Sequence, residues 1–391
     1  CQDVGEEKEG MKIAFVIYNW SESKGGVERY GYDLARYLTK EGNEIHVFCS
    51  NKDSTSSPNT IFHIVPSNGI FSYLKYLAFA NNSARMLKDD KFDIIHGFGR
   101  TYAQDIYRVG SGCHWEYLRN RHPSMSSIFV RIIQYLNPRN QVIMHLERKS
   151  FDKGAYKKVV CISNRVKQEV QEHYHIPDQD IKVIYNGIDL ARFNPANRGK
   201  YRSEIRTKLG LSDNEIVILF VGSGFERKGL QYAIESLALV PADKRSNLKL
   251  LVVGNGNIGK YQSLAKRHDI GNQVLFTGAQ TQIERYYAAG DIFLFPTLYE
   301  PFGTVCLEAM ASGLPVITTR IAGASEVIAN SIDSFVINAP SDTKAIAEKI
   351  VCLLDPVWRG NMSQAAALTA SKYSFEDNFR QVKEVYKEVV C

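Results

Sequence analysis

The sequence lacks several features that define whole classes of protein. No apolar run reaches the roughly 18 to 20 residues that a membrane-spanning helix needs, and no basic stretch followed by an apolar run marks a secretory signal. The composition of the whole chain lacks the low hydrophobicity and high net charge of disordered proteins, and 44% of the 391 residues are hydrophobic, which suffices for a large core. We therefore expect a globular, cytosolic protein of two or three domains.

Cysteine pairs and metal-ligand clusters are also missing. The seven cysteines are odd in number, scattered and without any CxxC pair, which argues against disulfides and structural zinc. No group of His, Asp and Glu has metal-ligand spacing, and no DxD-type carboxylate pair is placed to hold a metal-bound diphosphate. We expect reduced, mostly buried thiols and a protein that needs neither a metal nor another cofactor.

Short apolar runs alternate with segments of helical period, which is typical of α/β layers with parallel strands. The first ten residues are acidic and non-periodic, so we expect the native start at Met11. A strand over 12–18 leads into a loop with Gly25-Gly26 and a helix that stops at Gly42. Further strands are expected at 44–49, 61–65, 92–96, 159–163 and 181–185, and then at 216–222, 248–254, 273–277, 291–296, 315–319 and 334–337.

A change of composition divides the chain. Residues 186–189 lead into a stretch with Pro195, Asn197 and Gly199, which suits a hinge near 186–200. We predict two Rossmann-like, doubly wound domains, 11–190 and 200–372, that face each other across a cleft, and a helix over 375–389 that can pack back on the first domain. Ligands of such sheets bind at the carboxyl ends of the strands, so the cleft is the expected active site.

A glycine motif in the second half offers an alternative function. The segment 250–259 contains G-x-G-x-x-G directly after a strand, which is the pattern of a dinucleotide-binding turn and thus of a nicotinamide-dependent oxidoreductase. That function also needs an acidic residue about 20 positions later to hold the ribose diol, and Thr277, Gly278 and Ala279 occupy this place. We therefore interpret the motif as a tight turn between a strand and a helix.

The segment 298–317 carries a more specific pattern. The strand over 291–296 delivers a loop with Glu300, and a helix opens at about Gly303, so free amides there suit a phosphate or sugar hydroxyls. Glu308 follows about one and a half turns later, and two carboxylates so spaced can each accept hydrogen bonds from a diol. The alternative is a Glu300 that stabilises the helix dipole and a solvated Glu308. The amides in question belong to Phe302, Gly303, Thr304 and Val305.

The run Glu-x7-Glu and the Gly-Leu-Pro-Val-Ile after it resemble glycosyltransferase family 4, whose members are retaining enzymes with the GT-B fold. The resemblance implies that Glu300 holds hydroxyls of the donor hexose and that Glu308 holds the ribose diol. Residues 220–229 resemble the family's basic segment that grips the donor pyrophosphate. Gly25-Gly26 resembles its N-terminal glycine loop, and residues 185–189 resemble its interdomain segment.

The basic pair in 220–229 also has a physical reason. Breaking the anomeric C–O bond leaves negative charge on a diphosphate, which a site without a metal must stabilise with fixed positive groups. Arg227 offers a planar fork and Lys228 a point charge, and the alternative is an exposed basic pair in a loop.

Gly25-Gly26 would let the backbone approach a phosphate or an acceptor, although a plain turn has the same signature. A retaining course in which the departing phosphate takes the acceptor's proton needs no protein nucleophile.

Within family 4, the closest likeness is to the lipopolysaccharide core glucosyltransferases that act on an inner heptose, and it is carried by residues 107–114, 146–148 and 221–229. It implies UDP-glucose as the donor. It also implies a position for His114 near the anomeric centre or the acceptor, where an imidazole can act as a donor or a base; a structural histidine is the alternative. Ser111 stands where related proteins usually carry an acidic residue, which weakens the acceptor assignment and leaves the donor assignment untouched.

One stretch carries the whole excess of positive charge. Residues 115–158 contain nine basic and three acidic residues, and the net charge of the chain is +6. A basic amphipathic helix suits the surface of an anionic inner membrane, while a core-facing helix with a solvated basic side is the alternative. No nucleic-acid recognition motif accompanies the charge. The apolar stripe of this helix consists of Ile128, Phe129, Ile132, Ile133 and Leu136.

The leading hypothesis is a metal-independent, retaining hexosyltransferase that moves glucose from UDP-glucose to a cell-envelope glycolipid, with the lipopolysaccharide core heptose as the favoured acceptor, at the inner face of the inner membrane. Alternatives are a family 4 enzyme with another UDP- or GDP-sugar or acceptor, a non-catalytic nucleotide-sugar-binding protein, and the oxidoreductase. The predicted catalytic residues are Glu300, Arg227, Lys228 and His114, and the predicted donor-binding residues are Gly25, Gly26, Phe302, Gly303, Thr304, Val305 and Glu308.

Overall fold

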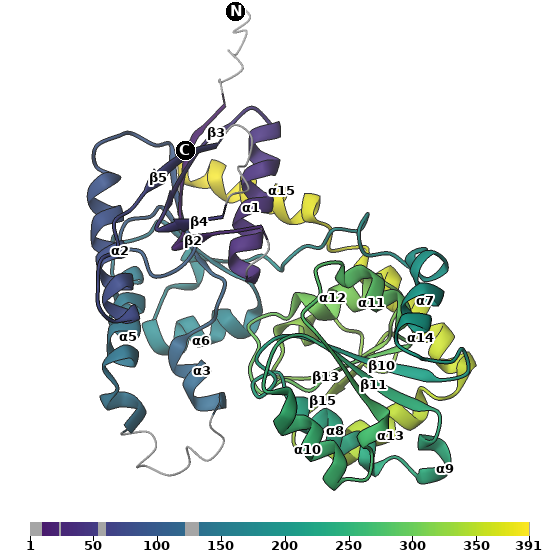
Figure 1. The fold of residues 1–391 in the computed structure, drawn as a ribbon. Coiled ribbons are helices and arrows are strands. Elements are labelled where there is room, and N and C mark those ends of the chain that lie inside the picture. The colour runs from purple at the N-terminus through teal and green to yellow at the C-terminus, as the bar shows by residue number, and fades with distance from the viewer. Residues whose placement is uncertain (1–9, 23–24, 54–59, 122–132, 391) are drawn as a thin grey trace, which may run out of the picture. The chain divides into compact units, whose positions relative to one another are not determined.

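The computed structural model describes residues 10–22, 25–53, 60–121 and 133–390. The chain forms two compact units (Figure 1). The N-terminal unit runs to Ile184 and also takes in the end of the chain from Phe379, and the C-terminal unit comprises Tyr185–Asn378. The chain therefore passes between the units twice, at 184–185 and at 378–379, the second time within the last helix, α15 (Phe375–Val390).

The described part of the N-terminal unit contains a parallel, seven-stranded sheet with the order β5-β3-β1-β6-β7-β8-β9. Its strands are β1 (Lys12–Val16), β3 (Glu44–Cys49), β5 (Thr60–Ile64), β6 (Ile94–Gly97), β7 (Ile106–Val109), β8 (Lys158–Cys161) and β9 (Ile181–Val183). A separate short pair is formed by β2 (Asn19–Trp20) and β4 (Asn51–Lys52). The helices are α1 (Gly26–Lys40), α2 (Ser72–Met86), α3 (His114–Arg121), α5 (Pro138–Ser150), α6 (Asn164–Tyr174), the 3-10 helix η2 (Asp178–Asp180) and most of α15.

The C-terminal unit contains a parallel, six-stranded sheet with the order β12-β11-β10-β13-β14-β15. Helices lie on both faces of this sheet, with α8, α10 and α13 on one side and α11 and α12 on the other (Figure 1). The strands are β10 (Ile216–Val221), β11 (Leu248–Val253), β12 (Val274–Gly278), β13 (Ile292–Phe295), β14 (Val316–Thr319) and β15 (Phe335–Ile337). The helices are α7 (Asn197–Lys208), α8 (Leu230–Leu239), α9 (Ala242–Arg245), α10 (Ile258–Arg267), η3 (Gly271–Gln273), α11 (Ile283–Ala289), α12 (Thr304–Ala311), η4 (Gly323–Glu326), α13 (Thr343–Cys352) and α14 (Pro356–Ala370).

Both sheets confirm the predicted α/β class with two Rossmann-like units. In each of the two large sheets, the strand that comes first in the sequence lies next to the strand that comes fourth in that sheet. The connections therefore diverge between β1 and β6 and again between β10 and β13. Loops that leave such a point move apart and open a crevice at the carboxyl ends of the strands, where ligands of this fold bind. The fold therefore marks two places for chemistry, one in each unit.

Strand β7 is a correction to the strands predicted from the sequence, which omit it. Tyr107 and Arg108 interrupt the apolar run that usually marks a buried parallel strand. Both side chains are nevertheless buried, and the Arg108 guanidinium lies 3.5 Å from the ring centre of Tyr30 in α1. A polar residue at a buried strand position thus concealed the strand because its partner, an aromatic ring on another element, is not adjacent in the sequence.

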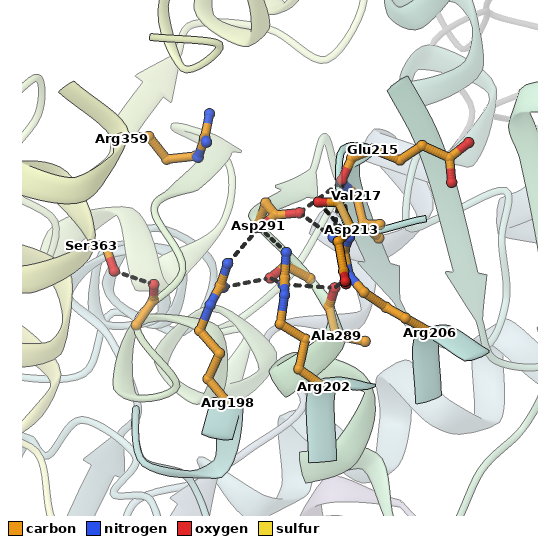
Figure 2. A network of polar contacts seen from close by, with 12 residues as sticks. Arg198, Arg202, Arg206, Asp213, Glu215, Val217, Ala289, Asp291, Arg359 and Ser363 are labelled. Atoms are coloured by element: carbon orange, nitrogen blue, oxygen red, sulfur yellow. Dashed lines mark hydrogen bonds and ion pairs between the residues drawn. The ribbon is translucent and has the colours of Figure 1, made fainter. Parts of the chain in front are cut away.

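Helix α7 is fastened to the sheet of the C-terminal unit by a cluster of charges (Figure 2). Arg198, Arg202 and Arg206 occupy one face of α7 and converge on Asp291, the residue before β13, with N–O distances of 2.8, 2.8 and 2.6 Å. The Val217 amide of β10 donates to the same carboxylate over 2.9 Å. Burial raises the pKa of Asp291, but the three guanidinium groups and this amide outweigh it and hold the pKa below its usual value. The cluster fixes the start of the strand that leads to Glu300.

Some sequence predictions fall on residues outside the described ranges. These include residues 1–9 and three members of the apolar stripe, Ile128, Phe129 and Ile132. The two described members, Ile133 and Leu136, are 65% and 62% exposed. Within the described ranges, five cysteines are free, no group of three His, Cys, Asp or Glu side chains could hold a metal ion, and no helix is long and apolar enough to cross a bilayer.

Candidate active site

The two loops that follow β10 and β13 are fastened to each other. The Leu298 amide and the Thr297 hydroxyl both donate to the carbonyl oxygen of Arg227, over 2.9 and 3.0 Å. Gly229, at φ +77°, passes so close that an added Cβ would lie 1.8 Å from the Pro296 carbonyl oxygen. Because glycine alone fits there, the backbone fixes the position of the basic loop relative to the acidic one.

Glu300 is the centre of a charged cluster in these loops. Its Oε2 atom accepts a hydrogen bond from the Arg227 guanidinium at 2.9 Å and also pairs with the Lys228 ammonium group. Arg227 donates in addition to the carbonyl oxygen of Tyr299 at 2.9 Å. The side chains of Glu300 and Lys228 are 14% and 12% exposed, against 29% for Arg227. The pair of Glu300 with Lys228 is therefore the better shielded one.

The electrostatics of this cluster favour an ionised carboxylate. Burial alone would raise the pKa of Glu300, but the charges of Lys228 and Arg227 outweigh it and hold the pKa below its usual value. Burial lowers the pKa of Lys228, an effect that Glu300 opposes and Arg227 reinforces. Two cations thus face one carboxylate, and the cluster is positive overall. Among the described residues none donates to Oε1 of Glu300, which leaves this oxygen available to a ligand.

Helix α12 begins soon after Glu300, with Gly303 as its N-terminal cap and Thr304 as its first residue. Amides in the first turn of a helix have no carbonyl partner within the helix and favour an anion. Further along α12, Glu308 accepts a hydrogen bond of 2.8 Å from the hydroxyl of Tyr287. Burial and the adjacent Glu308 charge keep the pKa of Tyr287 well above its ordinary value. The phenol therefore remains a donor and fixes one oxygen of Glu308.

Sequence reasoning missed three residues that support this helix end. Tyr287 carried no motif, since it lies in the apolar pattern of α11. Tyr185 and Asn186 belong to the segment that resembles the family's interdomain segment, but no role followed from the pattern. The Asn186 amide donates to the Thr304 hydroxyl over 3.1 Å, and the Tyr185 ring lies 5.9 Å from the ring of Phe302. Only the folded chain brings Tyr185 and Asn186 to the start of α12, because more than a hundred positions separate them from it in the sequence.

The glycine motif after β11 has a structural explanation. A Cβ at Gly254 would lie 2.2 Å from the Gly222 carbonyl oxygen, and one at Gly256 would lie 2.3 Å from the ring of Phe225. The two glycines let the turn after β11 pack against the loop after β10. Close packing of the backbone thus explains both glycines. This agrees with the prediction that the motif is a tight turn between a strand and a helix.

Gly25 and Gly26 stand in the N-terminal unit, at the start of α1. Gly25 caps this helix at φ +79°, where an added Cβ would lie 2.3 Å from a carboxylate oxygen of Glu28. No described atom lies within 4 Å of the place of a Cβ on Gly26. The turn alone explains Gly25, and the space beside Gly26 gives a ligand room to approach the backbone.

His114 is the first residue of α3 and is held by the N-terminal unit on two sides. Its backbone amide donates to both carboxylate oxygens of Glu147, over 3.1 and 3.0 Å, and its Nε2 atom lies 3.1 Å from Oδ1 of Asn140. Asn140 donates its own amide group to Gln134, which assigns Oδ1 as the acceptor. Nε2 of His114 therefore carries the proton, and Nδ1 keeps its lone pair.

Burial lowers the pKa of His114 to about 4; the hydrogen bond to Asn140 opposes the shift, and the charges of Arg100 and Arg139 add to it. The imidazole is therefore neutral at physiological pH. Burial raises the pKa of Glu147, while the Tyr174 hydroxyl, the His114 amide and the charge of Arg100 oppose the shift. His114 is thus presented as a neutral ring that can accept a proton or a hydrogen bond.

The structure brings together only part of the predicted site. Arg227 and Lys228 contact Glu300 directly, and Phe302, Gly303, Thr304, Val305 and Glu308 lie on the loop and helix that follow it, all in the C-terminal unit. Gly25, Gly26 and His114 belong to the N-terminal unit. The two groups stand after strands of two different sheets.

Comparisons with known proteins identify both halves of the chain. Residues 24–192 match the family described as Glycosyltransferase Family 4, and residues 201–367 match that of Glycosyl transferases group 1. A glycosyltransferase of Methanocaldococcus jannaschii is 26% identical, covering 96% of this chain and 98% of that protein. The lipopolysaccharide glucosyltransferase WaaG of Escherichia coli K12 is also 26% identical, with 86% and 88% covered. The N-acetyl-α-D-glucosaminyl L-malate synthase of Bacillus anthracis is 26% identical, with 97% of each covered.

Solved structures agree with these relatives. The crystal structure of WaaG superposes with a TM-score of 0.83 and 24% identity, covering 96% of this chain and 99% of that one. Anabaena HepE in complex with UDP-glucose superposes with a TM-score of 0.73 and 18% identity, covering 97% and 100%.

The fold and these matches define the class of the protein, a glycosyltransferase with the GT-B fold. Within that class, residues 24–192 belong to the glycosyltransferase family 4 domain and residues 201–367 to the group 1 domain, and the chain is similar to WaaG. This membership removes the basis for the oxidoreductase alternative.

Proposed function

We propose that the protein is a retaining hexosyltransferase that takes glucose from UDP-glucose without a metal ion and transfers it to a cell-envelope glycolipid, favouring the lipopolysaccharide core heptose. The observation that carries the donor part is the contact of Glu300 with both Arg227 and Lys228 beside the start of α12. Its position after β10 and β13 is where ligands of Rossmann-like sheets bind.

The chemistry follows from the charges in this cluster. When the anomeric C–O bond breaks, the diphosphate gains negative charge, and Arg227, Lys228 and the first amides of α12 are fixed donors that stabilise it. Glu300 orders the two cations through Oε2 and offers Oε1 to a hydroxyl of the hexose. Glu308, held by Tyr287, accepts from the ribose diol. The acceptor attacks the face that UDP leaves, and the departing phosphate takes its proton, so that no protein nucleophile is needed.

The acceptor part of the proposal rests on the relatives of the chain and on its charge. The similarity to a lipopolysaccharide glucosyltransferase favours a glycolipid acceptor, whereas the similarity to an L-malate synthase favours a small acceptor. The nine basic residues in 115–158 favour docking to an anionic membrane face. We expect salt-sensitive binding to anionic vesicles, and equal binding to neutral vesicles would contradict membrane docking.

The proposed reaction is tested by measuring UDP release from UDP-glucose with and without deep-rough lipopolysaccharide as the acceptor. We expect UDP release that depends on the acceptor, continues in EDTA, and yields a product whose NMR coupling shows the α-anomer of the donor. Glu300→Gln and Arg227→Ala should lose this activity while keeping the wild-type circular dichroism spectrum. A β-linked product would contradict retention, and loss of activity in EDTA that Mg²⁺ restores would contradict metal independence.

Two other functions give different results in the same assay. A family 4 enzyme with another donor would release nucleotide from a different member of a panel of UDP- and GDP-sugars. A non-catalytic nucleotide-sugar-binding protein would bind UDP and release none from any donor. A thermal-shift screen over the same panel identifies the donor independently of turnover, because a bound ligand stabilises the folded protein.

A further inference from the structure

Asn140 connects the turn before α5 to His114. It stands in the first turn of α5 and is 6% exposed. Its Nδ2 group donates to the backbone carbonyl oxygen and to Oε1 of Gln134, over 2.9 and 3.0 Å, and its Oδ1 atom lies 3.1 Å from Nε2 of His114. A buried amide with hydrogen-bond partners on both of its sides is held in one place. Asn140 is therefore a fixed support for the imidazole.

The backbone of Gln134 decides which way round the Asn140 amide lies. A backbone carbonyl oxygen accepts hydrogen bonds and cannot donate them. If the amide were turned over, Oδ1 would face this carbonyl oxygen, and the contact would be repulsive. The amide thus keeps Oδ1 towards His114, and Nε2 of the ring must carry the proton that it donates. The tautomer of His114 follows from a backbone group whose role cannot change.

The contacts that hold His114 itself leave one ring nitrogen for a ligand. Glu147 accepts from its backbone amide over 3.1 and 3.0 Å, Asn140 accepts from Nε2, and the ring of Tyr117 lies 5.8 Å away at an interplanar angle of 23°. The imidazole is half-buried, and among the described residues none donates to Nδ1. The lone pair on Nδ1 can therefore accept a hydrogen bond from a hydroxyl group.

We propose that Asn140 is a positioning residue for the transfer reaction: it fixes the tautomer and the orientation of His114, so that Nδ1 accepts a hydrogen bond from a hydroxyl group of a bound sugar. The inference rests on the proposed function and adds the residue that sets the role of this histidine. The hydroxyl at Nδ1 is not the reacting one, whose proton goes to the departing phosphate. Its hydrogen bond orients the sugar beside the reacting atoms.

Nuclear magnetic resonance of protein with ¹⁵N-labelled histidine measures the tautomer without turnover. Imidazole signals distinguish protonated from unprotonated ring nitrogens, and the signals of His114 are those that vanish in His114→Gln. We expect a protonated Nε2 and an unprotonated Nδ1 in the wild type at neutral pH. Asn140→Leu should show both tautomers, and Gln134→Ala should change less, because the backbone carbonyl remains. Asn120→Leu is the matched control, since Asn120 is an amide on the same helix as His114 that donates to Glu116.

Kinetics show whether this position matters for the reaction. Asn140→Leu should lower kcat about tenfold to a hundredfold, the cost of a misplaced group near the reacting atoms, while Asn120→Leu should keep the wild-type value. In Asn140→Asp, a carboxylate still accepts from Nε2 but favours the charged ring. The pKa of His114, which burial lowers to about 4 in the wild type, should then rise, and the acid limb of the pH profile of kcat should move to higher pH with it. An asparagine with a merely structural role would leave this limb unchanged.

Added ligands identify the sugar. The labelled protein receives UDP-glucose, or UDP together with the core oligosaccharide of deep-rough lipopolysaccharide, with UDP alone as the blank. A shift of the Nδ1 signal with one of them assigns the hydroxyl to the donor or to the acceptor. No shift with either, a protonated Nδ1 in the wild type, or wild-type kcat in Asn140→Leu would overturn the proposal. Absence of UDP release by the wild type would count against the proposed function, and the tautomer and the Nδ1 shift would still decide the role of Asn140.

Discussion

The two sheets have the same topology but carry different chemistry where their connections diverge. In the C-terminal unit, the loops after β10 and β13 hold a carboxylate between two cations, all three shielded from solvent to a large extent. In the N-terminal unit, the elements after β6 and β7 present a neutral histidine, His114, and an arginine, Arg100, that lies over the ring of Tyr76. The fold therefore marks the place of a site, and the residues in its loops decide what the site binds.

The two sites also differ in what holds their ligand-binding side chains in place before a ligand binds. In the C-terminal unit, opposite charges already order one another, so a diphosphate meets donors whose positions are fixed. In the N-terminal unit, order comes from stacking and from hydrogen bonds to the backbone, as between Arg100 and Tyr76 or His114 and Glu147. We expect electrostatic substitutions to affect the C-terminal unit most, and four predictions test this comparison in order of decreasing effect.

The largest effect is expected for Asp291→Asn, which removes the carboxylate that pairs with the three arginines of α7. Arg206 is 1% exposed and would keep its charge without the carboxylate that it contacts. Removing one partner of a buried ion pair costs about 3–5 kcal/mol. Chemical denaturation should show this loss, and hydrogen exchange should place it in the C-terminal unit.

The matched control for this prediction is Asp243→Asn, which removes an exposed carboxylate from α9 of the same unit. Its free energy of unfolding should stay within about 0.5 kcal/mol of the wild type. If Asp291→Asn lost no more stability than this control, the cluster of arginines would not be what holds α7 to the sheet.

The next effect is expected for Lys228→Met on catalysis. The substitution keeps the length of the side chain and removes a shielded cation that faces Glu300. Loss of one fixed donor to a developing charge lowers kcat by roughly 10²–10³-fold. Arg227→Met should cost less, because Arg227 is more exposed.

Steady-state assays of UDP release check this ranking, with Lys266→Met on α10 as the control for loss of a lysine elsewhere in the unit. An equal fall in kcat for Lys228→Met and Lys266→Met would remove Lys228 from the catalytic site. A larger fall for Arg227→Met than for Lys228→Met would reverse the ranking that burial predicts.

The sequence predicted the fold better than it predicted contacts. Regular apolar runs indicated all six strands of the C-terminal sheet, because strands buried on both faces are apolar along their length. They missed β7, where Arg108 is paired with an aromatic ring on another element. The Glu-x7-Glu pattern pointed to Glu300 and Glu308 because both stand on one continuous segment. Tyr287 and Asn186 could not be found in this way, since they reach α12 only through the tertiary structure.

A smaller effect is expected for Glu308→Gln on nucleotide recognition. The amide keeps an acceptor for the Tyr287 hydroxyl, so the fold should be preserved. If Glu308 accepts from the ribose diol, loss of its charge removes about 1.5–3 kcal/mol of a charge-assisted hydrogen bond. The affinity for UDP should fall accordingly, whereas the affinity for 2′,3′-dideoxy-UDP, which lacks both hydroxyls of the diol, should change little.

Both nucleotides are titrated by calorimetry into the wild type and into Glu308→Gln. The four affinities form a double-mutant cycle, which isolates the interaction free energy between Glu308 and the ribose hydroxyls. Equal losses for UDP and 2′,3′-dideoxy-UDP would show that Glu308 supports the helix rather than the ribose. Such a result would leave Glu300 as the only sugar-binding carboxylate of the pair and would narrow the donor site to the loops after β10 and β13.

The smallest effect is expected in the N-terminal unit, for His114→Gln. Burial holds the pKa of His114 at about 4 in the folded protein, while an unfolded histidine has a pKa of about 6.5. Between these values the unfolded chain binds a proton that the native state does not, so the histidine contributes its full stability above about pH 6.5 and loses it as the pH falls towards 4. With solvent screening of a half-buried ring, we expect a loss on the order of 1 kcal/mol across this window. His114→Gln should flatten the dependence of the free energy of unfolding on pH between about 6.5 and 4, and an unchanged slope would mean that the ring becomes protonated in the folded state as readily as in the unfolded chain.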